Sequence, residues 1–513
     1  MIKKTRTILF CLLIILFLIV APGTIFYSWG YRFNFETKRI TQTGAFYFKV
    51  LPKSARIYLN GKSVKKTDFF FGAAYLDNLL PKKYEVEIKK EGYHPWKKTL
   101  EIKERQVTDA KNIVLAPENP ELTILTKKAE EIFVSPDEKK VILREAGEEG
   151  WSLKLLELEK NVKSHLINQR NISKTQFSLS DLRFSPDSKR ILLKVESKGE
   201  MQYFLLDLDK NPSSLISLDF LEVDELRSSP PFADARVKYA QDAFFHPENS
   251  QKLFLYKKGG IFEGDLIQKK VSLPLLENVI SYQISKGAFY YLAGPGPDSG
   301  FLFKTDFSFL NREKINKTPF PLEKGFDYKI SISPDKIFLQ DDQNLFLFNP
   351  DLKTFERFFE TAKELKISPD FKKLVYFSDY EIWILFLKED FGQPRKSAGE
   401  KVFIARFSEK IGKVFWYSSH YLIFNYPSAA KGGEEQTFFD YPSAAKGGEE
   451  QTFFDSGPKI KIVEIDDRDK INIVDLAPPT TTGEGLEIFF NQNDKKLYIF
   501  NQGNLYSSER LLP

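Results

Sequence analysis

Short runs of apolar residues alternate with tight turns along most of the chain after residue 120. Four of these turns have the sequence Ser-Pro-Asp, beginning at Ser135, Ser185, Ser333 and Ser368. Pro fixes the φ angle that the second position of a turn requires, while Ser and Asp side chains bond nearby backbone amides. An apolar strand stands on each side of the turn. The pattern therefore predicts a repeated unit of strand, tight turn and strand.

Weaker copies of this unit bring the count to eight. They keep a turn between two apolar strands without the full Ser-Pro-Asp sequence, and their turns begin at His246, Ser285, Ser418 and Asn491. A unit of about 49 residues with several short strands is what one blade of a β-propeller requires. The 48 Phe and 22 Tyr, against 2 Met, also favour strands. We expect residues 121–513 to form an eight-bladed β-propeller, with seven blades as the alternative if one unit is miscounted.

The two ends of this region predict that the ring closes. The last unit offers three strands, at 486–491, 495–500 and 504–507, and is one strand short. A further strand, 122–126, stands before the first full unit. It can supply the missing outer strand, which removes the free edge of the last sheet.

The Ser-Pro-Asp units resemble those of TolB-like and WD-repeat propellers. Glycine usually follows the Asp in that family, whereas the residues at this place in the chain are Glu138, Ser188, Lys336 and Phe371. The departure indicates a divergent member or a looser turn. The resemblance implies an architecture and not a chemistry, because this fold hosts binding proteins and enzymes alike.

Long insertions are expected mostly on one face of the ring. In such propellers the first-to-second strand turns lie on one face, and the second-to-third connections and the links between blades lie on the other. The Ser-Pro-Asp turns mark the first face. The insertions fall mostly in the second class, at 144–151, 211–241, 293–300 and 427–457. Because functional loops gather where a scaffold tolerates length, we expect a partner on the face of the insertions.

The longest insertion contains a perfect duplication. Residues 426–440 and 441–455 have the same sequence. The aromatic pairs of the two copies are candidate interaction residues, because they could form an adhesive tip: Phe438, Phe439, Phe453 and Phe454. We favour recent copying of a tolerant loop without function, because identical copies show no sign of divergent selection.

The amino-terminal segment is long and apolar enough to cross a bilayer as a helix. It has no charged residue from Thr7 to Tyr31, and Lys3, Lys4 and Arg6 precede it without an acidic residue. The positive-inside bias then keeps the amino terminus in the cytoplasm and places the rest of the chain outside. Residues 1–31 are therefore predicted to be a cytoplasmic tip and an uncleaved membrane anchor. The alternative is a cleaved signal peptide.

A small β domain is predicted at 45–117, after a linker at 32–44. It alternates like a set of short strands, with Asn60-Gly61 as a strong hairpin signal. Three pieces, 52–62, 80–81 and 89–93, resemble the PEGA domain, a small β-sandwich of bacterial and archaeal envelope proteins. The name-giving Pro-Glu-Gly-Ala reads Pro-Lys-Ser-Ala here, and Lys82 replaces a later glycine.

The resemblance implies a spacer or surface-interaction module and not an enzyme. Tyr93 and Trp96 are candidate interaction residues, since Tyr and Trp are favoured at interfaces. The interpretation we favour for these two rings is that they cover the core of the small domain itself.

Charge and composition narrow the function further. Residues 32–120 carry 18 Lys and Arg against 10 Asp and Glu, which suits an anionic membrane face or wall polymer, while a solvated surface without a partner is equally compatible. The single cysteine, Cys11, lies in the apolar segment, so no disulfide forms within the chain. No metal site, cofactor or catalytic constellation is visible, and the predicted exported location disfavours nucleic acid.

These observations predict a non-enzymatic, membrane-anchored binding or scaffold protein. Its propeller is expected to dock a protein or glycan partner of the cell envelope outside the membrane. The alternatives are a propeller enzyme that hydrolyses or cleaves glycans with paired carboxylates around the central channel, and a purely structural spacer.

Overall fold

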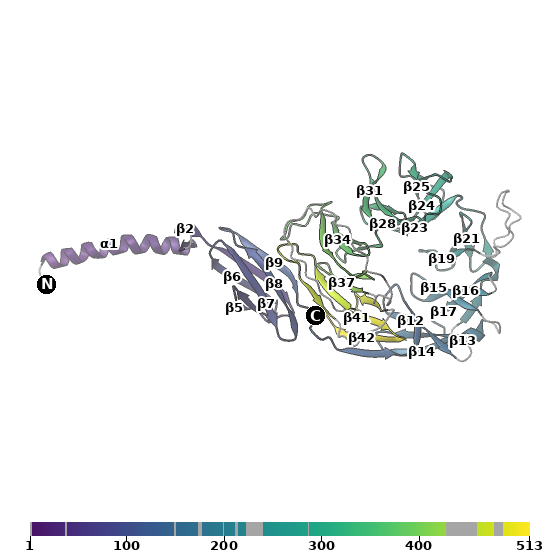
Figure 1. The fold of residues 1–513 in the computed structure, drawn as a ribbon, viewed down its shortest axis with the longest axis horizontal. Coiled ribbons are helices and arrows are strands. Elements are labelled where there is room, and N and C mark those ends of the chain that lie inside the picture. The colour runs from purple at the N-terminus through teal and green to yellow at the C-terminus, as the bar shows by residue number, and fades with distance from the viewer. Residues whose placement is uncertain are drawn as a thin grey trace.

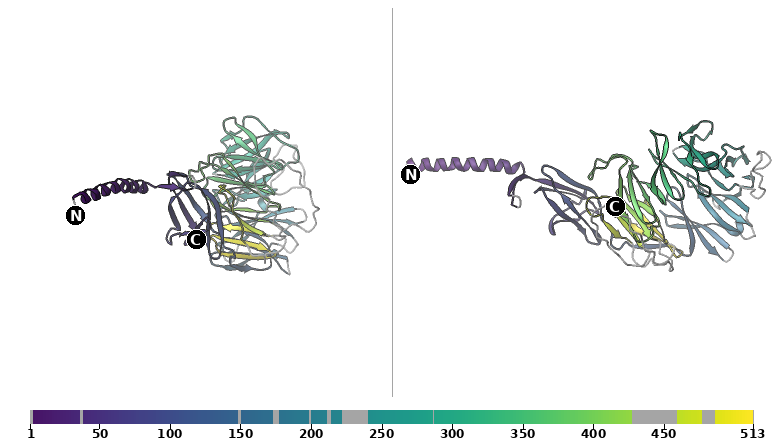
Figure 2. Two further views of the ribbon diagram at one scale, coloured as in Figure 1. Left: turned by 60° about the vertical axis from the view of Figure 1, so that its left-hand side comes forward. Right: turned by 45° about the horizontal axis from the view of Figure 1, so that its top comes forward.

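The computed structural model describes residues 3–35, 38–147, 150–172, 177–197, 200–210, 214–221, 240–285, 287–426, 459–476 and 486–512. A long helix, a small β domain and a ring of sheets follow one another along the long axis of the molecule (Figures 1 and 2). This order of parts agrees with the fold class that the sequence predicts: mainly β, with an apolar helix at the amino terminus.

The apolar segment forms helix α1 (Lys3–Ser28). Its stretch Ile8–Ser28 has a mean hydropathy of 2.9, so it is long and apolar enough to be a membrane anchor or a signal sequence. The predicted linker after it contains a hairpin of β1 (Tyr31–Asn34) and β2 (Arg39–Gln42).

The small domain consists of two sheets packed face to face. One sheet has the order β6-β3-β9, formed by β6 (Ala73–Leu79), β3 (Gly44–Leu51) and β9 (Val107–Val114). The other has the order β5-β4-β7-β8, formed by β5 (Lys62–Lys66), β4 (Arg56–Leu59), β7 (Lys83–Lys90) and β8 (Tyr93–Glu101). Alternate residues of both sheets, such as Phe46 and Ile57, form one apolar core between them.

Eight antiparallel sheets follow, and each is one blade. The first four are β11 (Ala129–Val134), β12 (Lys140–Gly147), β13 (Gly150–Glu157) and β14 (Val162–Asn168); β15 (Ser178–Phe184), β16 (Arg190–Ser197), β17 (Glu200–Asp207) and β18 (Ser214–Ser217); β19 (Asp242–Phe245), β20 (Lys252–Lys257), β21 (Gly260–Asp265) and β22 (Lys270–Val271); and β23 (Val279–Ser285), β24 (Ala288–Gly296), β25 (Ser299–Thr305) and β26 (Arg312–Lys314), with β27 (Phe320–Pro321) beside β25.

The remaining four blades are β28 (Lys329–Ile332), β29 (Ile337–Gln340), β30 (Asn344–Asn349) and β31 (Thr354–Glu360); β32 (Glu364–Ile367), β33 (Lys373–Phe377), β34 (Glu381–Phe386) and β35 (Lys401–Arg406); β36 (Val414–Ser418), β37 (Tyr421–Tyr426), β38 (Lys459–Glu464) and β39 (Ile473–Asp475); and β40 (Glu487–Asn491), β41 (Lys496–Asn501), β42 (Asn504–Arg510) and β10 (Leu122–Thr126). Two short 3-10 turns, Gln169–Asn171 and Asp219–Leu221, lie between strands of the described part.

The ring closes through β10, which precedes the first blade in sequence and pairs antiparallel with β42 of the last, with Leu122 opposite Ser508. Eight apolar clusters then lie between neighbouring blades all the way round, including one that joins Leu143 of the first blade to Tyr498 of the last. The predictions of eight blades and of a closing outer strand are therefore confirmed.

The Ser-Pro-Asp turns are held together by the Ser side chain. The Ser135 hydroxyl donates to the Asp137 carboxylate at 2.6 Å and accepts the Lys140 backbone N–H at 2.9 Å. The residue after the Asp is left-handed in three of the four turns, with φ of 55° at Glu138, 54° at Ser188 and 57° at Phe371. These turns keep the tight geometry that glycine normally provides, and a residue with a Cβ is strained there.

Candidate functional site

The small domain docks on the face of the ring that carries the Ser-Pro-Asp turns. It contacts the connection between β38 and β39 in blade seven and the connection between β34 and β35 in blade six. Third-to-fourth strand connections lie on the same face as first-to-second turns, because successive antiparallel strands reverse direction. The docking therefore covers part of the face that the sequence analysis considered free of function.

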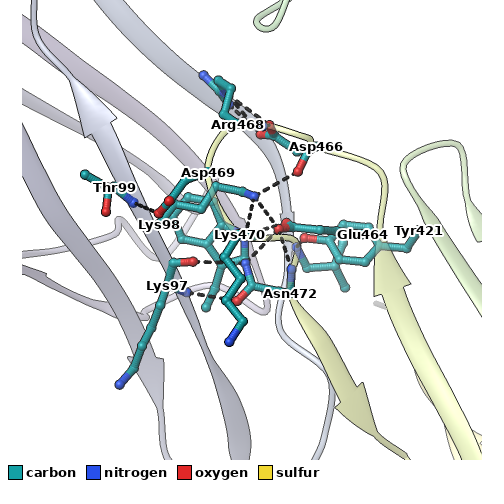
Figure 3. A network of polar contacts seen from close by, with 12 residues as sticks. Lys97, Lys98, Thr99, Tyr421, Glu464, Asp466, Arg468, Asp469, Lys470 and Asn472 are labelled. Carbon is teal, nitrogen blue, oxygen red and sulfur yellow. Dashed lines mark hydrogen bonds and ion pairs between the residues drawn. The ribbon is translucent and has the colours of Figure 1, made fainter. Parts of the chain in front are cut away.

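A buried ion pair lies at the centre of this junction (Figure 3). Nζ of Lys98 on β8 is 2.6 Å from Oε1 of Glu464 at the end of β38, and the two side chains are 0% and 2% exposed. Lys98 also donates to the backbone carbonyls of Asp466 and Lys470, at 2.8 and 3.0 Å. All three Lys98 contacts lie on the propeller, so the cation is transferred from water into a site that blade seven provides.

The Glu464 carboxylate is fully supplied with donors. The Trp96 indole N–H donates to Oε2 at 2.8 Å, and Asn472 donates its backbone and side-chain N–H to Oε1 at 2.9 and 2.7 Å. Burial raises the pKa of Glu464 above its usual range, and the Lys98 ammonium opposes that shift. Removal of one partner would leave the other buried and unpaired, which typically costs about 3–5 kcal/mol.

Backbone contacts extend the junction on both sides of the ion pair. The Asn472 side chain exchanges hydrogen bonds with the backbone of Lys97, and the Asp469 carboxylate accepts the Thr99 N–H at 2.6 Å. Gln393 of blade six exchanges hydrogen bonds with the backbone of β9. The two parts are thus joined along two strands, β8 and β9, and not through a flexible linker alone.

His420 lies in the same junction, in the turn between β36 and β37. A small cavity of about 60 Å³ adjoins it, lined also by Trp96 and Glu464. Burial lowers the pKa of His420 to about 4, and the Lys373 ammonium acts in the same direction. The imidazole is therefore neutral in the folded protein at ordinary pH.

A larger cavity of about 640 Å³ lies in the centre of the ring. The first strands of blades one, two, seven and eight line it, and each contributes one partly exposed phenylalanine: Phe133, Phe184, Phe415 and Phe489. Pro136 marks its end at the Ser-Pro-Asp face, and Lys413 and Glu487 lie towards the opposite face. The cavity thus combines aromatic walls with a charged edge.

The charged residues of this cavity form ion pairs with one another or with charged side chains nearby, including one on a neighbouring blade. Lys413 Nζ lies 3.0 Å from Glu487 Oε2. Arg183 contacts the carboxylates of Asp181 and Asp242 at 2.8 and 2.9 Å, which links blade two to blade three. These ion pairs tie the charged side chains of the lining to one another and to the neighbouring blades.

A tyrosine hydroxyl extends this link to blade four. Tyr282 donates to Asp242 Oδ2 at 2.7 Å. Burial raises the pKa of Tyr282, which keeps the hydroxyl protonated so that it can donate. Among the residues that the structure describes, no group of three His, Cys, Asp or Glu side chains could hold a metal ion.

The candidate interaction residues of the small domain lie inward. Trp96 is 3% exposed and belongs to the core of that domain, while its indole N–H reaches the propeller. Tyr93 packs against the same core. Trp96 therefore contacts another part of the same chain.

The predicted insertions are only partly described. Phe438, Phe439, Phe453 and Phe454 lie outside the described residues, as do 211–213, 222–239 and the whole of 427–457. In the described part of 144–151 and in 293–300, β12 with β13 and β24 with β25 extend as paired strands, so these segments are largely part of the sheets and not loops.

Sequence reasoning missed Lys98, Glu464 and the phenylalanines of the cavity. A signal for the first two was present. Lys98 is in phase with Trp96 and Leu100 on β8, and Glu464 is in phase with Ile460 and Ile462 on β38. A charge at an inward position of an alternating strand indicates a buried partner. The cavity had no such signal, because its lining comes from both ends of the propeller sequence, blades one and two and blades seven and eight, which become neighbours only in the closed ring.

The chain was compared with known protein families, curated proteins and solved structures. The PEGA domain model matches residues 50–118. Three similar solved structures are described as the crystal structure of the eukaryotic initiation factor, the Dos1 propeller, and the WD40 domain of SCAP from fission yeast. Each is 10% identical to the chain, with TM-scores of 0.44, 0.43 and 0.38, and the matches cover 79%, 76% and 77% of this chain and 95%, 94% and 98% of the respective structures.

A search of curated proteins finds no match. The topology of the eight sheets and their closing strand assign the larger part of the chain to the propeller fold. The chain therefore carries a PEGA domain at 50–118, followed by a β-propeller.

Proposed function

We propose that the protein is a membrane-anchored binding protein of the cell envelope, whose propeller docks a protein or glycan outside the membrane. Helix α1 would remain in the bilayer, with Lys3, Lys4 and Arg6 on the cytoplasmic side. The PEGA domain would then hold the propeller at a fixed distance from the membrane surface.

The observation that carries this proposal is the aromatic cavity in the centre of the ring. A concave site lined by apolar and aromatic side chains with a few polar groups is the usual form of a binding site. Aromatic faces stack on sugar rings and on apolar side chains of peptides, so both partner classes fit this lining. A purely structural spacer has no need of such a site.

The arrangement of the domains supports the same proposal. The PEGA domain occupies part of the Ser-Pro-Asp face at blades six and seven, so it does not stand over the opposite end of the cavity, where Lys413 and Glu487 lie. A partner approaching from outside the cell would meet that opposite face first. This is also the face on which the sequence analysis expected the partner.

The charge of the lining favours binding over glycan cleavage. A glycoside hydrolase needs two carboxylates, one of which donates a proton to the leaving group. The residues that line the described cavity include one carboxylate, Glu487, which pairs with Lys413. We therefore place the enzyme second.

Photocrosslinking in living cells tests the proposal. A photoreactive phenylalanine analogue at Phe489 should form an adduct with one envelope component, because this ring faces the cavity. The same analogue at Phe371, an exposed ring on the Ser-Pro-Asp face, is the matched control and should form none. Mass spectrometry of the adduct distinguishes a peptide from a glycan. Equal adducts at both positions, or none at Phe489, would contradict a partner in the cavity.

A further inference from the structure

The hairpin of β1 and β2 has one apolar face and one polar face. Phe33 lies directly opposite Ile40 in the register, and Phe35 follows on the same side as Phe33. Arg32 and Arg39 fall on the alternate side, because successive residues of a strand point to opposite faces. The hairpin is therefore amphipathic.

The apolar face of this hairpin is exposed. Phe33, Phe35 and Ile40 are 48%, 82% and 69% exposed, and the rings of Phe33 and Phe35 contact each other edge to face at 5.0 Å. Large apolar side chains gathered on one exposed face indicate an interaction surface. A two-stranded hairpin is also marginally stable in water without a partner for its apolar face.

The position of the hairpin is fixed at the end of α1. The Arg32 guanidinium lies 3.5 Å from the centre of the Tyr27 ring and donates to the Tyr27 carbonyl at 2.7 Å. The Thr43 N–H donates to the Gly30 carbonyl at 2.9 Å, which joins the end of the hairpin to the end of the helix. The hairpin therefore begins where the apolar helix ends and cannot move far from it.

The same arginine joins the hairpin to the PEGA domain. Nη2 of Arg32 donates to the side-chain oxygen of Asn78 on β6 at 2.9 Å. Helix, hairpin and PEGA domain are thus connected through one side chain. Whatever fixes the hairpin would also fix the orientation of the parts that follow it.

We infer that the apolar face of the hairpin inserts into the interfacial region of the bilayer that α1 spans, with Phe33, Phe35 and Ile40 among the lipid headgroups and upper acyl chains. This inference rests on the proposed membrane anchor. Aromatic residues favour this region of a bilayer, and Tyr27 and Trp29 at the end of α1 extend the same belt. Arg39 and Lys38 provide positive charge for anionic headgroups.

Insertion gives the hairpin a mechanical role. A single helix in a bilayer leaves the domain outside free to rotate and tilt about its exit point. A second contact beside the helix removes part of that freedom, and the Arg32 contacts with Tyr27 and Asn78 transmit the constraint to the PEGA domain. The propeller would then face away from the membrane in a preferred orientation.

Spin-label accessibility in the full chain tests the insertion. The protein is reconstituted in vesicles of phosphatidylcholine and phosphatidylglycerol, and single labels are placed in a Cys11→Ser background at Phe35→Cys, Ile40→Cys and Arg39→Cys. Labels at 35 and 40 should collide more with oxygen, which concentrates in the bilayer, and a label at 39 more with a water-soluble nickel chelate.

Phe69→Cys is the matched control, because Phe69 is a 74% exposed phenylalanine on the PEGA domain, in the segment between β5 and β6. Its label should be accessible to the chelate.

A label on the native Cys11 separates this inference from the anchor on which it rests. If Cys11 is shielded from the chelate while positions 35 and 40 are as accessible to it as position 69, the anchor stands and the insertion is wrong. If Cys11 is itself accessible to the chelate, the anchor and the insertion both fail. Shielding at 11, 35 and 40 with accessibility at 39 and 69 is the result that we expect.

Discussion

At the scale of single residues, the Ser-Pro-Asp turns show how the repeat tolerates the loss of its usual glycine. The Ser hydroxyl bonds both the Asp carboxylate and the backbone beyond the turn, and the following residue takes the left-handed conformation. The sequence analysis offered a divergent family member or a looser turn, and in these three turns the left-handed residue keeps the turn tight.

This strain predicts the effect of restoring glycine. Phe371→Gly should raise the free energy of unfolding by about 1 kcal/mol, because Phe371 has a φ of 57° and its exposed ring packs little. Lys336→Gly is the matched control: the turn at Ser333 closes at Lys336 itself, which is not left-handed. Glycine at position 336 should lower the free energy of unfolding by about 0.5–1 kcal/mol. Equal effects of the two substitutions in denaturant unfolding would contradict the strain.

His420 makes the stability of the folded protein depend on pH. Its pKa falls from 6.5 to about 4 on folding, so between these values the unfolded chain binds a proton that the folded chain does not. The free energy of unfolding therefore falls as pH falls through this window, by about 2 kcal/mol at pH 5 for a group of this kind.

A substitution isolates this contribution. In His420→Gln, the loss of stability between pH 7 and pH 5 should be smaller than in the wild type by roughly that amount, about 2 kcal/mol, in urea titrations at the two pH values. The carboxylates act equally in both proteins and cancel in the comparison. Identical pH dependence of the two proteins would show that His420 is not buried in the junction.

At the scale of elements, the strands and their order could be predicted from the sequence because their signals are local. Turn residues and alternation lie within a few positions of one another, and even the closing strand β10 was identified because one unit lacked a strand. The hairpin of β1 and β2 was missed because each strand has four residues, too few for their alternation to stand out from a linker.

The docking of elements could not be predicted in the same way. Lys98 and Glu464 belong to different domains, and a single Lys or Glu in a sequence is usually a solvated surface residue. Their inward phase on β8 and β38 indicated burial, but nothing in the sequence paired one with the other. The cavity is even harder to predict from the sequence, because its four phenylalanines come from blades one, two, seven and eight and meet only when the ring closes.

At the scale of the whole molecule, the ion pair and the hydrogen bonds around it join the PEGA domain to the propeller, and we expect the two to behave as one rigid body. The docking covers part of the Ser-Pro-Asp face and involves no contact with the opposite face of the described propeller. The sequence analysis expected function on that opposite face, and the position of the PEGA domain supports the same side. If the proposed anchor and binding face are right, a rigid connection gives that face a fixed position relative to the membrane.

The rigid junction can be tested most directly by a distance between the two domains. Pulsed electron paramagnetic resonance measures this distance between two spin labels. The labels are attached at Val64→Cys on β5 and at Leu352→Cys between β30 and β31, both exposed positions, in a Cys11→Ser background. The wild-type chain should give one narrow distance distribution.

Lys98→Met should broaden this distribution, because Glu464 would be left buried without its cation. Lys97→Met is the matched control: that neighbouring side chain is exposed and pairs with Glu87 of its own domain, so the distribution should stay narrow. A broad distribution in the wild type, unchanged by Lys98→Met, would contradict the rigid junction.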